Sequence, residues 1–221
     1  IIALWAFTFL IGLPISAVRS AIMLSMYCIT FMLQREDKPF NALALSACII
    51  LMANPVALFD AGFQLSFMAV LGIAIVYRPL SNSWKPQLRP LRWAWELTCV
   101  SLAAQLFTFP LVLYYFGRVS PYFLLSNFVV IPATTGLLYL AIVLLVSTPI
   151  HGLQLLVYHL MLQIAQGMTA GVRGIVQLPG AQLPAIYTTL SQTFLLYVAL
   201  FALVGAWYKL QAKREDAALL A

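Results

Sequence analysis

Long stretches of this chain contain no charged side chain, and its polar residues gather at a few points between them. No Asp, Glu, Lys or Arg occurs between Glu96 and Arg118, between Arg118 and Arg173, or between Arg173 and Lys209. Each of these gaps exceeds the roughly 20 apolar residues that cross a bilayer as a helix. Since the runs lack the alternation of barrel strands, the pattern predicts an all-α fold, a polytopic membrane helical bundle.

Breaks in the apolar pattern predict about 7–8 transmembrane or half-spanning helices. Prolines and clusters of charge mark these breaks. The first segment and the next two are short, which suits tilted or half-inserted helices. The predicted apolar segments cover residues 1–14, 20–34, 40–54, 60–77, 94–116, 122–147, 151–172 and 191–208. Because the chain is already apolar at Ile1, we expect it to be an N-terminally truncated part of a longer protein.

Composition and charge add an orientation to this picture. Hydrophobic residues make up 63% of the 221 residues and charged residues 8%, against roughly a quarter charged in a soluble domain. Cytoplasmic loops of membrane proteins carry an excess of Lys and Arg. With the C-terminus inside, residues 1–208 form the transmembrane domain and 209–221 a cytoplasmic basic tail. The basic residues then assigned to the inside are Arg35, Lys38, Arg78, Lys85, Arg89, Arg92, Lys209, Lys213 and Arg214; Arg19, Arg118 and Arg173 remain outside.

Asp60 is the only acidic residue that this orientation places away from the cytoplasmic loops and their edges. The dipeptide Asn54-Pro55 ends the preceding helix and allows a short turn to deliver Asp60 to the next one. Gln64 follows one helical turn later on the same face. Arg19 lies on the same predicted side of the membrane, so an ion pair with Asp60 is one reading. The other is that both are water-exposed loop charges or that Asp60 only caps its helix.

Two further polar stripes follow from helical spacing. The first is formed by Thr98, Ser101, Gln105 and Thr108. It should face other helices or water, and interhelical hydrogen bonding and a pore lining both explain it. The second is formed by His159, Gln163, Gln166 and Arg173. It can line an outward vestibule or lie along the membrane interface, and the sequence leaves both readings open.

Motifs for catalysis are missing from the sequence. It has no P-loop, no GxSxG nucleophile elbow and no HExxH zinc pair. His151 and His159 are eight residues apart without a nearby Cys or acid, which does not suit a metal site. We therefore expect no enzyme activity, no cofactor and no metal, and favour transport or conduction.

Several stretches resemble the ComEC competence family, the bacterial channel for incoming DNA. Asn54-Pro55 with the run from Asp60 to Phe67, DAGFQLSF, is similar to the NP...D.GFQLSF signature and is the most specific match. The run from Pro14 to Ala21, PISAVRSA, resembles the PSxxRA-type motif. The later blocks that resemble this family are Thr108-Phe109-Pro110, Phe116-Gly117 with Ser120, and Asn127 with Pro132.

The resemblance implies a membrane channel for single-stranded DNA during natural transformation, in the bacterial inner membrane. It implies single-stranded DNA, the lipid bilayer and other competence proteins as partners: a DNA receptor, a cytoplasmic translocation motor, and a nuclease domain or protein. An oligomer is left open. The residues expected to line the DNA path or to form the structural motif are Arg19, Asn54, Pro55, Asp60, Gly62, Phe63, Gln64, Ser66, Phe67, Gln105, Thr108, Pro110, Gly117, Arg118, Asn127 and Arg173.

Single-stranded DNA needs basic groups for its phosphates and aromatic faces for its bases. Arg19, Arg118 and Arg173 are predicted at the outer mouth, and Phe63, Phe67, Tyr114, Tyr115 and Phe116 are candidate stacking rings. Aromatic residues also anchor helices at membrane interfaces. A small-solute transporter, which would carry inverted repeats, and a non-conducting integral-membrane scaffold are the alternatives.

Overall fold

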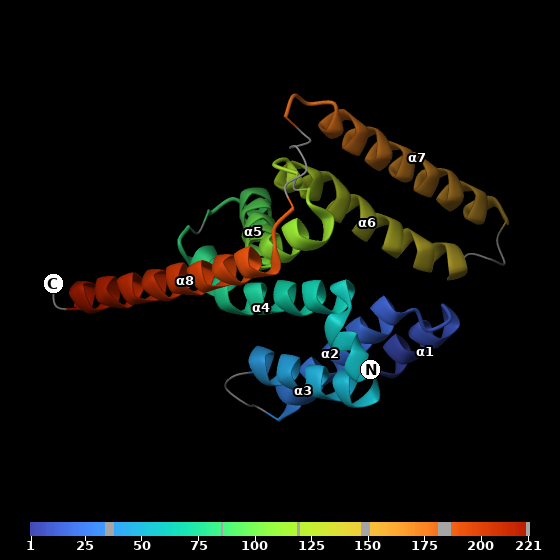
Figure 1. Ribbon diagram of the computed structural model, residues 1–221. Coiled ribbons are helices and arrows are strands. Elements are labelled where there is room, and N and C mark those ends of the chain that lie inside the picture. The colour runs from blue at the N-terminus through green and yellow to red at the C-terminus, as the bar shows by residue number, and fades with distance from the viewer. Residues whose placement is uncertain (34–37, 85, 119, 147–150, 181–186, 220–221) are drawn as a thin grey trace. The chain divides into compact units, whose positions relative to one another are not determined.

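The computed structural model describes residues 1–221 except 34–37, 85, 119, 147–150, 181–186 and 220–221 (Figure 1). Regular structure in the described residues is helical and includes no strand, so the predicted all-α fold is confirmed. The elements are α1 (Ile2–Leu10), α2 (Ile15–Met32), α3 (Lys38–Ala53), the 3₁₀ helix η1 (Pro55–Phe59), α4 (Ala61–Asn82), α5 (Arg89–Phe116), α6 (Phe123–Val146), α7 (His151–Val176) and α8 (Leu190–Leu219).

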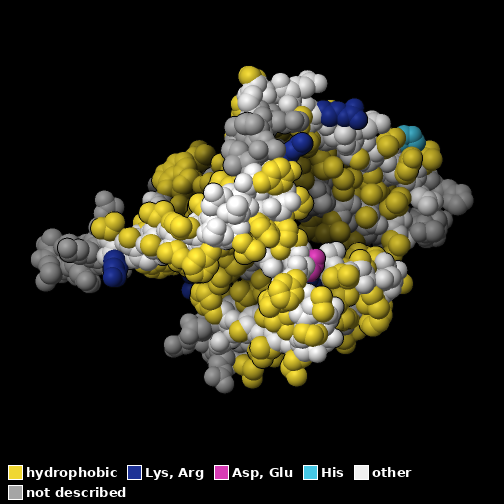
Figure 2. Space-filling view, viewed as in Figure 1, with side chains coloured by type: hydrophobic (Ala, Val, Ile, Leu, Met, Phe, Trp, Pro, Cys, Tyr) yellow, Lys and Arg dark blue, Asp and Glu magenta, His cyan; other side chains and the backbone are white. Residues whose placement is uncertain are grey.

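Six helices in the described part of the chain, α2 and α4 to α8, are long and apolar enough to cross a membrane. The apolar part of α3, Pro39–Ala53, is shorter, and α1 has 9 residues. Hydrophobic side chains cover most of the visible face (Figure 2), as expected where lipid rather than water surrounds the protein. The chain is a multi-pass membrane protein.

Some helix ends differ from the predicted ones. α2 begins at Ile15, directly after the extended Pro14, so Arg19 lies inside the helix rather than before it. α4 continues through Pro79 to Asn82 and α5 begins at Arg89, which leaves a shorter break than the one predicted between the segments 60–77 and 94–116. Long basic side chains can reach water from the last turns of a helix. A cluster of charges therefore overstates the length of a loop.

Clustering of contacts divides the chain into two compact units. The first consists of residues Ile1–Lys85, Leu102–Gly117 and Tyr187–Ala221, and the second of Pro86–Ser101 and Arg118–Ile186. α5 contributes its first part to the second unit and its last part to the first unit.

The core of the first unit lies where α4, α5 and α8 meet. Its buried residues are Val76, Ala103, Phe107 and Leu200. α4 approaches α5 closely at Gly72, where a Cβ atom would lie 2.8 Å from the Cβ of Phe107 and against the backbone of Ala103. Phe107 also accepts a hydrogen bond at its backbone oxygen from the Tyr197 hydroxyl of α8, at 2.9 Å. Because glycine has no side chain at position 72, α4 and α5 can approach this closely.

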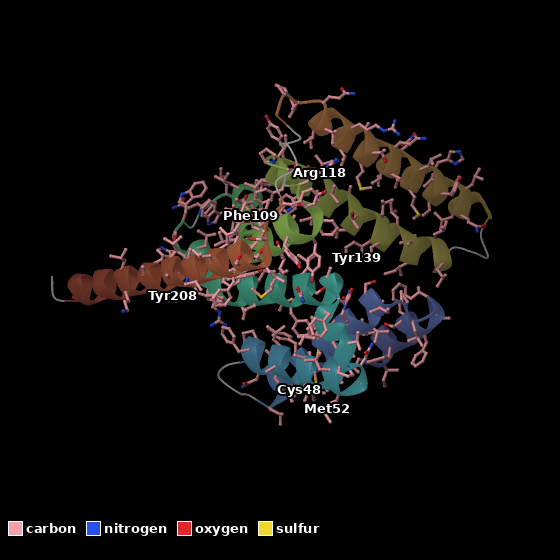
Figure 3. All side chains as sticks on the ribbon, in the orientation of Figure 1. Cys48, Met52, Phe109, Arg118, Tyr139 and Tyr208 are labelled. Carbon is pink, nitrogen blue, oxygen red and sulfur yellow. The ribbon has the colours of Figure 1, made fainter. Side chains whose placement is uncertain are left out.

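A hydrogen bond between α4 and α8 follows from the proline inside α4. Pro79 has no N–H, so the carbonyl of Ile75, four residues earlier, loses its helical partner. The Tyr208 hydroxyl on α8, labelled in Figure 3, donates a hydrogen bond to this oxygen at 2.6 Å. A backbone carbonyl that would be costly to leave unpaired in lipid is thereby satisfied from a neighbouring helix.

In the second unit, α6 and α7 run antiparallel side by side (Figure 1). A Cβ at Gly171 of α7 would lie 3.0 Å from Val129 Cγ1 of α6, and Thr134 Oγ1 donates to Met168 Sδ at 3.9 Å. Among the described residues, none lies within 4 Å of such a Cβ at Gly167, four residues earlier. Of these two glycines, Gly171 therefore marks the close helix contact.

Candidate functional site

The residues from Asn54 to Asp60 form a doubly capped turn between α3 and α4. The Asn54 side-chain oxygen accepts a hydrogen bond from the backbone N–H two residues later, at 3.1 Å, and caps η1, with Pro55 at its first position. Asp60 caps α4, since its carboxylate accepts hydrogen bonds from the N–H groups of Gly62 at 3.3 Å and Phe63 at 3.2 Å. Two successive caps fix the direction in which α4 leaves the turn.

The same carboxylate forms an ion pair with α2. Arg19 Nη1 donates to Asp60 Oδ2 at 2.5 Å. The Arg19 side chain is 11% exposed and that of Asp60 49% exposed. Since a guanidinium this buried needs an opposite charge, the pairing joins α2 to the start of α4. The predicted ion pair is confirmed, and Asp60 is a helix cap as well.

The surroundings of Asp60 keep it ionised. Desolvation raises the pKa of its carboxyl group, but the Arg19 hydrogen bond, the N–H groups of Gly62 and Phe63, and the Arg19 charge together lower it. The net effect is a pKa below the ordinary value of 3.8. Asp60 is therefore an anion at neutral pH, and its hydrogen bonds and its ion pair fit a structural rather than an acid–base role.

Gly62 makes room for the arginine. A Cβ at this position would lie 2.6 Å from Arg19 Nη2 and 3.1 Å from Nη1. Any larger residue would push the guanidinium out of its position against α4. The glycine of the DAGFQLSF run is thus explained by the close approach of a side chain from α2.

Gln64 extends the arrangement to α5. Its amide nitrogen donates to the Leu58 carbonyl of η1 at 2.9 Å. Its amide oxygen accepts a hydrogen bond from the Tyr115 hydroxyl at 3.0 Å. One side chain therefore ties the turn before α4 to the end of α5. The sequence indicates Tyr115 only as a stacking ring, because a hydrogen bond between side chains 51 residues apart has no signal in the spacing.

The rest of the motif serves the interior of α4. Ser66 Oγ donates to the Gly62 carbonyl at 2.6 Å. The rings of Phe63 and Phe67 lie 4.2 Å apart between centroids. Phe63 is only 5% exposed, so its ring packs inside the unit and is not open to a base. Together, the contacts of Arg19, Asp60, Gly62, Gln64 and Tyr115 connect α2, α4 and α5.

The polar stripe of α5 takes part in a bond between helices. Asn127 Nδ2 on α6 donates to the buried Ser101 Oγ at 3.0 Å, within the second unit. Thr98 and Thr108 instead donate to carbonyls of α5 itself, and Gln105 is half-buried. Interhelical bonding, one of the two predicted explanations, therefore accounts for the Ser101 end of the stripe.

The last turn of α5 ends at a glycine for a conformational reason. Gly117 has φ +62, in the left-handed region that favours glycine. Tyr187 covers the position, since a Cβ there would lie 2.6 Å from its ring atom Cε1. Pro110 lies within the same helix, two turns earlier.

The predicted residues that remain, Arg118 and Arg173, belong to the second unit. Both are exposed (Arg118 is labelled in Figure 3). Arg173 lies in the last turn of α7. The structure therefore gathers Arg19, Asp60 and Gln64 into one network in the first unit and leaves the other two arginines on the surface of the second.

Comparisons with known proteins agree with the sequence motifs. Residues 1–210 match the model of a family described as "Competence protein". The chain is similar to ComE operon protein 3 of Bacillus subtilis (strain 168), with 33% identity over 129 residues. The match covers 58% of this chain and 16% of that protein, so the chain corresponds to a minor part of its relative's length. No solved structure matches the chain.

Proposed function

This chain belongs to the competence protein family, and we propose that it is a channel domain passing single-stranded DNA into the cytoplasm during natural transformation. The family supports a role in DNA uptake. Six apolar helices support a location in the membrane. The step that the proposal adds is that the strand passes through this domain itself.

The charge on the outer side of the predicted topology carries the proposal. Asp60 is the one acidic residue assigned there, and Arg19 pairs with it at 2.5 Å. Arg118 and Arg173 are exposed. A polyanion arriving at that side would meet free guanidinium groups and a carboxylate already neutralised, which suits phosphate contacts.

The same charge pattern supports an orientation of the chain in the membrane. We place the chain in the bacterial inner membrane with the C-terminus in the cytoplasm, because nine of its twelve basic residues then lie inside. The domain conducts and does not catalyse. A DNA receptor outside delivers the substrate, a nuclease domain or protein provides a single strand, and a cytoplasmic motor supplies the driving force.

Deleting the gene in a transformable host that carries it tests this proposal. Radiolabelled duplex DNA is added, and label is followed outside the inner membrane and as cytoplasmic single strands. We expect label to accumulate outside and internal single strands to be lost, with recovery on complementation. Unchanged internal strands would contradict the channel and favour a scaffold or a small-solute transporter.

A further inference from the structure

The polar stripe of α7 lies opposite the side of the helix that packs against α6. Val157 and Ile175 are buried on the packed side, where Gly171 also meets α6. At about 100° per residue, the polar positions fall on the reverse side. These exposed residues are His159, Gln163, Gln166, Arg173 and Gln177. Basic and histidine side chains are visible on this side of α7 in Figure 2.

α6 sets the membrane depth of the stripe. Its span has a mean hydropathy of 2.3 and no charged residue, so it crosses the hydrocarbon. Thr134, in the middle of α6, donates to Met168 of α7. Met168 therefore lies near the bilayer midplane, and a helix packed lengthwise on α6 cannot lie flat on the membrane surface.

Helix geometry then gives the depth of each polar group. With a rise of about 1.5 Å per residue, Gln166 lies about 3 Å from the level of Met168, and Gln163 and Arg173 lie about 8 Å from it. The ends of the stripe lie about 14 Å away. Because half of the hydrocarbon core is about 15 Å thick, the stripe runs through nearly all of it.

Neither lipid nor a second copy of the chain suits this face. Amide and guanidinium groups facing acyl chains would be unsatisfied and costly. A second copy related by an axis along the membrane normal would bring equal depths together. Arg173 would then oppose its own copy, and no acidic residue exists between His151 and Gln177 to compensate.

We propose that this face of α7 lines the path of the DNA through the membrane and contacts the phosphodiester backbone of the single strand. This assignment rests on the proposed function. The side chains offer amide and guanidinium donors and no carboxylate, while His159 Nδ1 donates to the Leu155 carbonyl at 2.8 Å. Phosphate oxygens are acceptors only, and a guanidinium binds them bidentately. A row of donors at successive depths suits a strand that moves without sequence preference.

Thiol accessibility in the full-length protein in native membranes tests the assignment. All cysteines of the full-length protein, Cys28, Cys48 and Cys99 among them, are first replaced by serine. Single cysteines are then introduced on the stripe as Gln163→Cys and Gln166→Cys, and on the flanks as Leu160→Cys and Tyr158→Cys, which are also exposed. A charged, membrane-impermeant methanethiosulfonate should modify the stripe variants at least tenfold faster than the flank variants.

Protection by DNA tests the occupant. A single-stranded oligonucleotide should slow modification of the stripe variants several-fold and leave the flanks unchanged. An oligonucleotide of the same sequence with an uncharged backbone should protect much less, because the proposed contacts are to phosphates. Equal protection by both, or by neither, would overturn the backbone assignment.

Other results overturn the placement of α7. Stripe variants that react only with a lipid-soluble maleimide would mean that the face is not aqueous. Oxidative cross-linking of the Gln166→Cys variant to a second copy would make it an interface between copies. The proposed function fails separately, when uptake survives deletion of the gene. If uptake is lost on deletion while the stripe is unreactive, only the assignment of α7 falls.

Discussion

At the scale of single residues, Asp60 connects more groups than a surface carboxylate usually does. It caps α4 through two backbone N–H groups and pairs with Arg19 of α2. Asn54, six residues earlier, caps η1 in the same manner. The Asn54-Pro55 and DAGFQLSF stretches, which resemble the family signature, thus have a structural role in this unit. They fix the first turn of α4 against α2.

The Asp60→Asn variant should separate the contribution of the ion pair to stability from that of the helix cap. Asn caps helices about as well as Asp, so the variant loses mainly the pairing, which we expect to lower stability by about 0.5–1 kcal/mol. Asp60→Ala should lose about 1 kcal/mol more, because the cap is removed as well. Thermal unfolding in detergent measures both. DNA uptake should fall moderately with normal membrane insertion; unchanged uptake would contradict a role of the pair in transport.

The difference in stability between the wild type and Asp60→Asn should depend on pH in one direction. The pKa of folded Asp60 is lowered below its ordinary value of 3.8, so the carboxylate stabilises the fold above that value. Its contribution is lost as the pH falls through the lowered pKa. The stability gap between the wild type and Asp60→Asn should be constant near neutral pH and shrink below about pH 4. A gap that widens on acidification would contradict the pairing.

The sequence indicates part of this network, and the reason why it does not indicate the rest is physical. Asp60, Gln64 and Arg19 stood out because polar residues are rare in the chain and costly in lipid. The bond from Tyr115 to Gln64 was not predicted, since hydrogen-bond partners on different helices depend on which helices touch. Gly62 was singled out by resemblance only, and its reason is the position of Arg19.

At the scale of helices, small residues and prolines determine the packing. Gly72 allows α4 to approach α5, and Pro79 leaves a carbonyl that α8 satisfies through Tyr208. The missing N–H of Pro79 could have indicated an unpaired oxygen at Ile75, but not its donor. Apolar runs predict helices well because length in lipid is constrained, whereas the partners of each helix require the fold.

Gly72→Ala should lower the stability of the protein by about 1–3 kcal/mol, because the new methyl group overlaps Phe107 and the backbone of Ala103. Gly136→Ala is a matched control, since no atom of the described residues lies within 4 Å of a Cβ at this glycine of α6. It should be neutral or slightly stabilising. Thermal unfolding of both variants in detergent measures the contrast; equal effects would mean that α4 and α5 do not meet at Gly72.

Tyr208→Phe should cost about 1 kcal/mol, because the Ile75 carbonyl is left without a donor. Pro79→Ala restores an N–H four residues after Ile75 and provides the missing helical bond. In the Pro79→Ala background, Tyr208→Phe should therefore cost less, giving a coupling of about 0.5–1 kcal/mol. A double-mutant cycle of unfolding free energies measures it, and simple additivity would refute the link between the proline and the tyrosine.

At the scale of the molecule, the order of eight apolar segments was predictable and their grouping was not. Prolines and charge clusters between the apolar runs indicate the number of helices, because a segment that enters the bilayer must be apolar over most of its length. The division into two units runs through the middle of α5, where the sequence has no charge, proline or glycine to signal a boundary. The stripe of α7 was visible as a pattern, but its depth follows only from its packing on α6.

The most direct test of the account is to stop a strand during uptake and ask which protein surrounds it. DNA with a bulky protein block at one end and photoreactive nucleotides along its length is given to competent cells and irradiated once transport has stalled. We expect the strand to cross-link to this chain within the membrane, more strongly than to any other membrane protein. Cross-linking to another membrane protein alone, with this chain present and inserted, would contradict conduction through this domain.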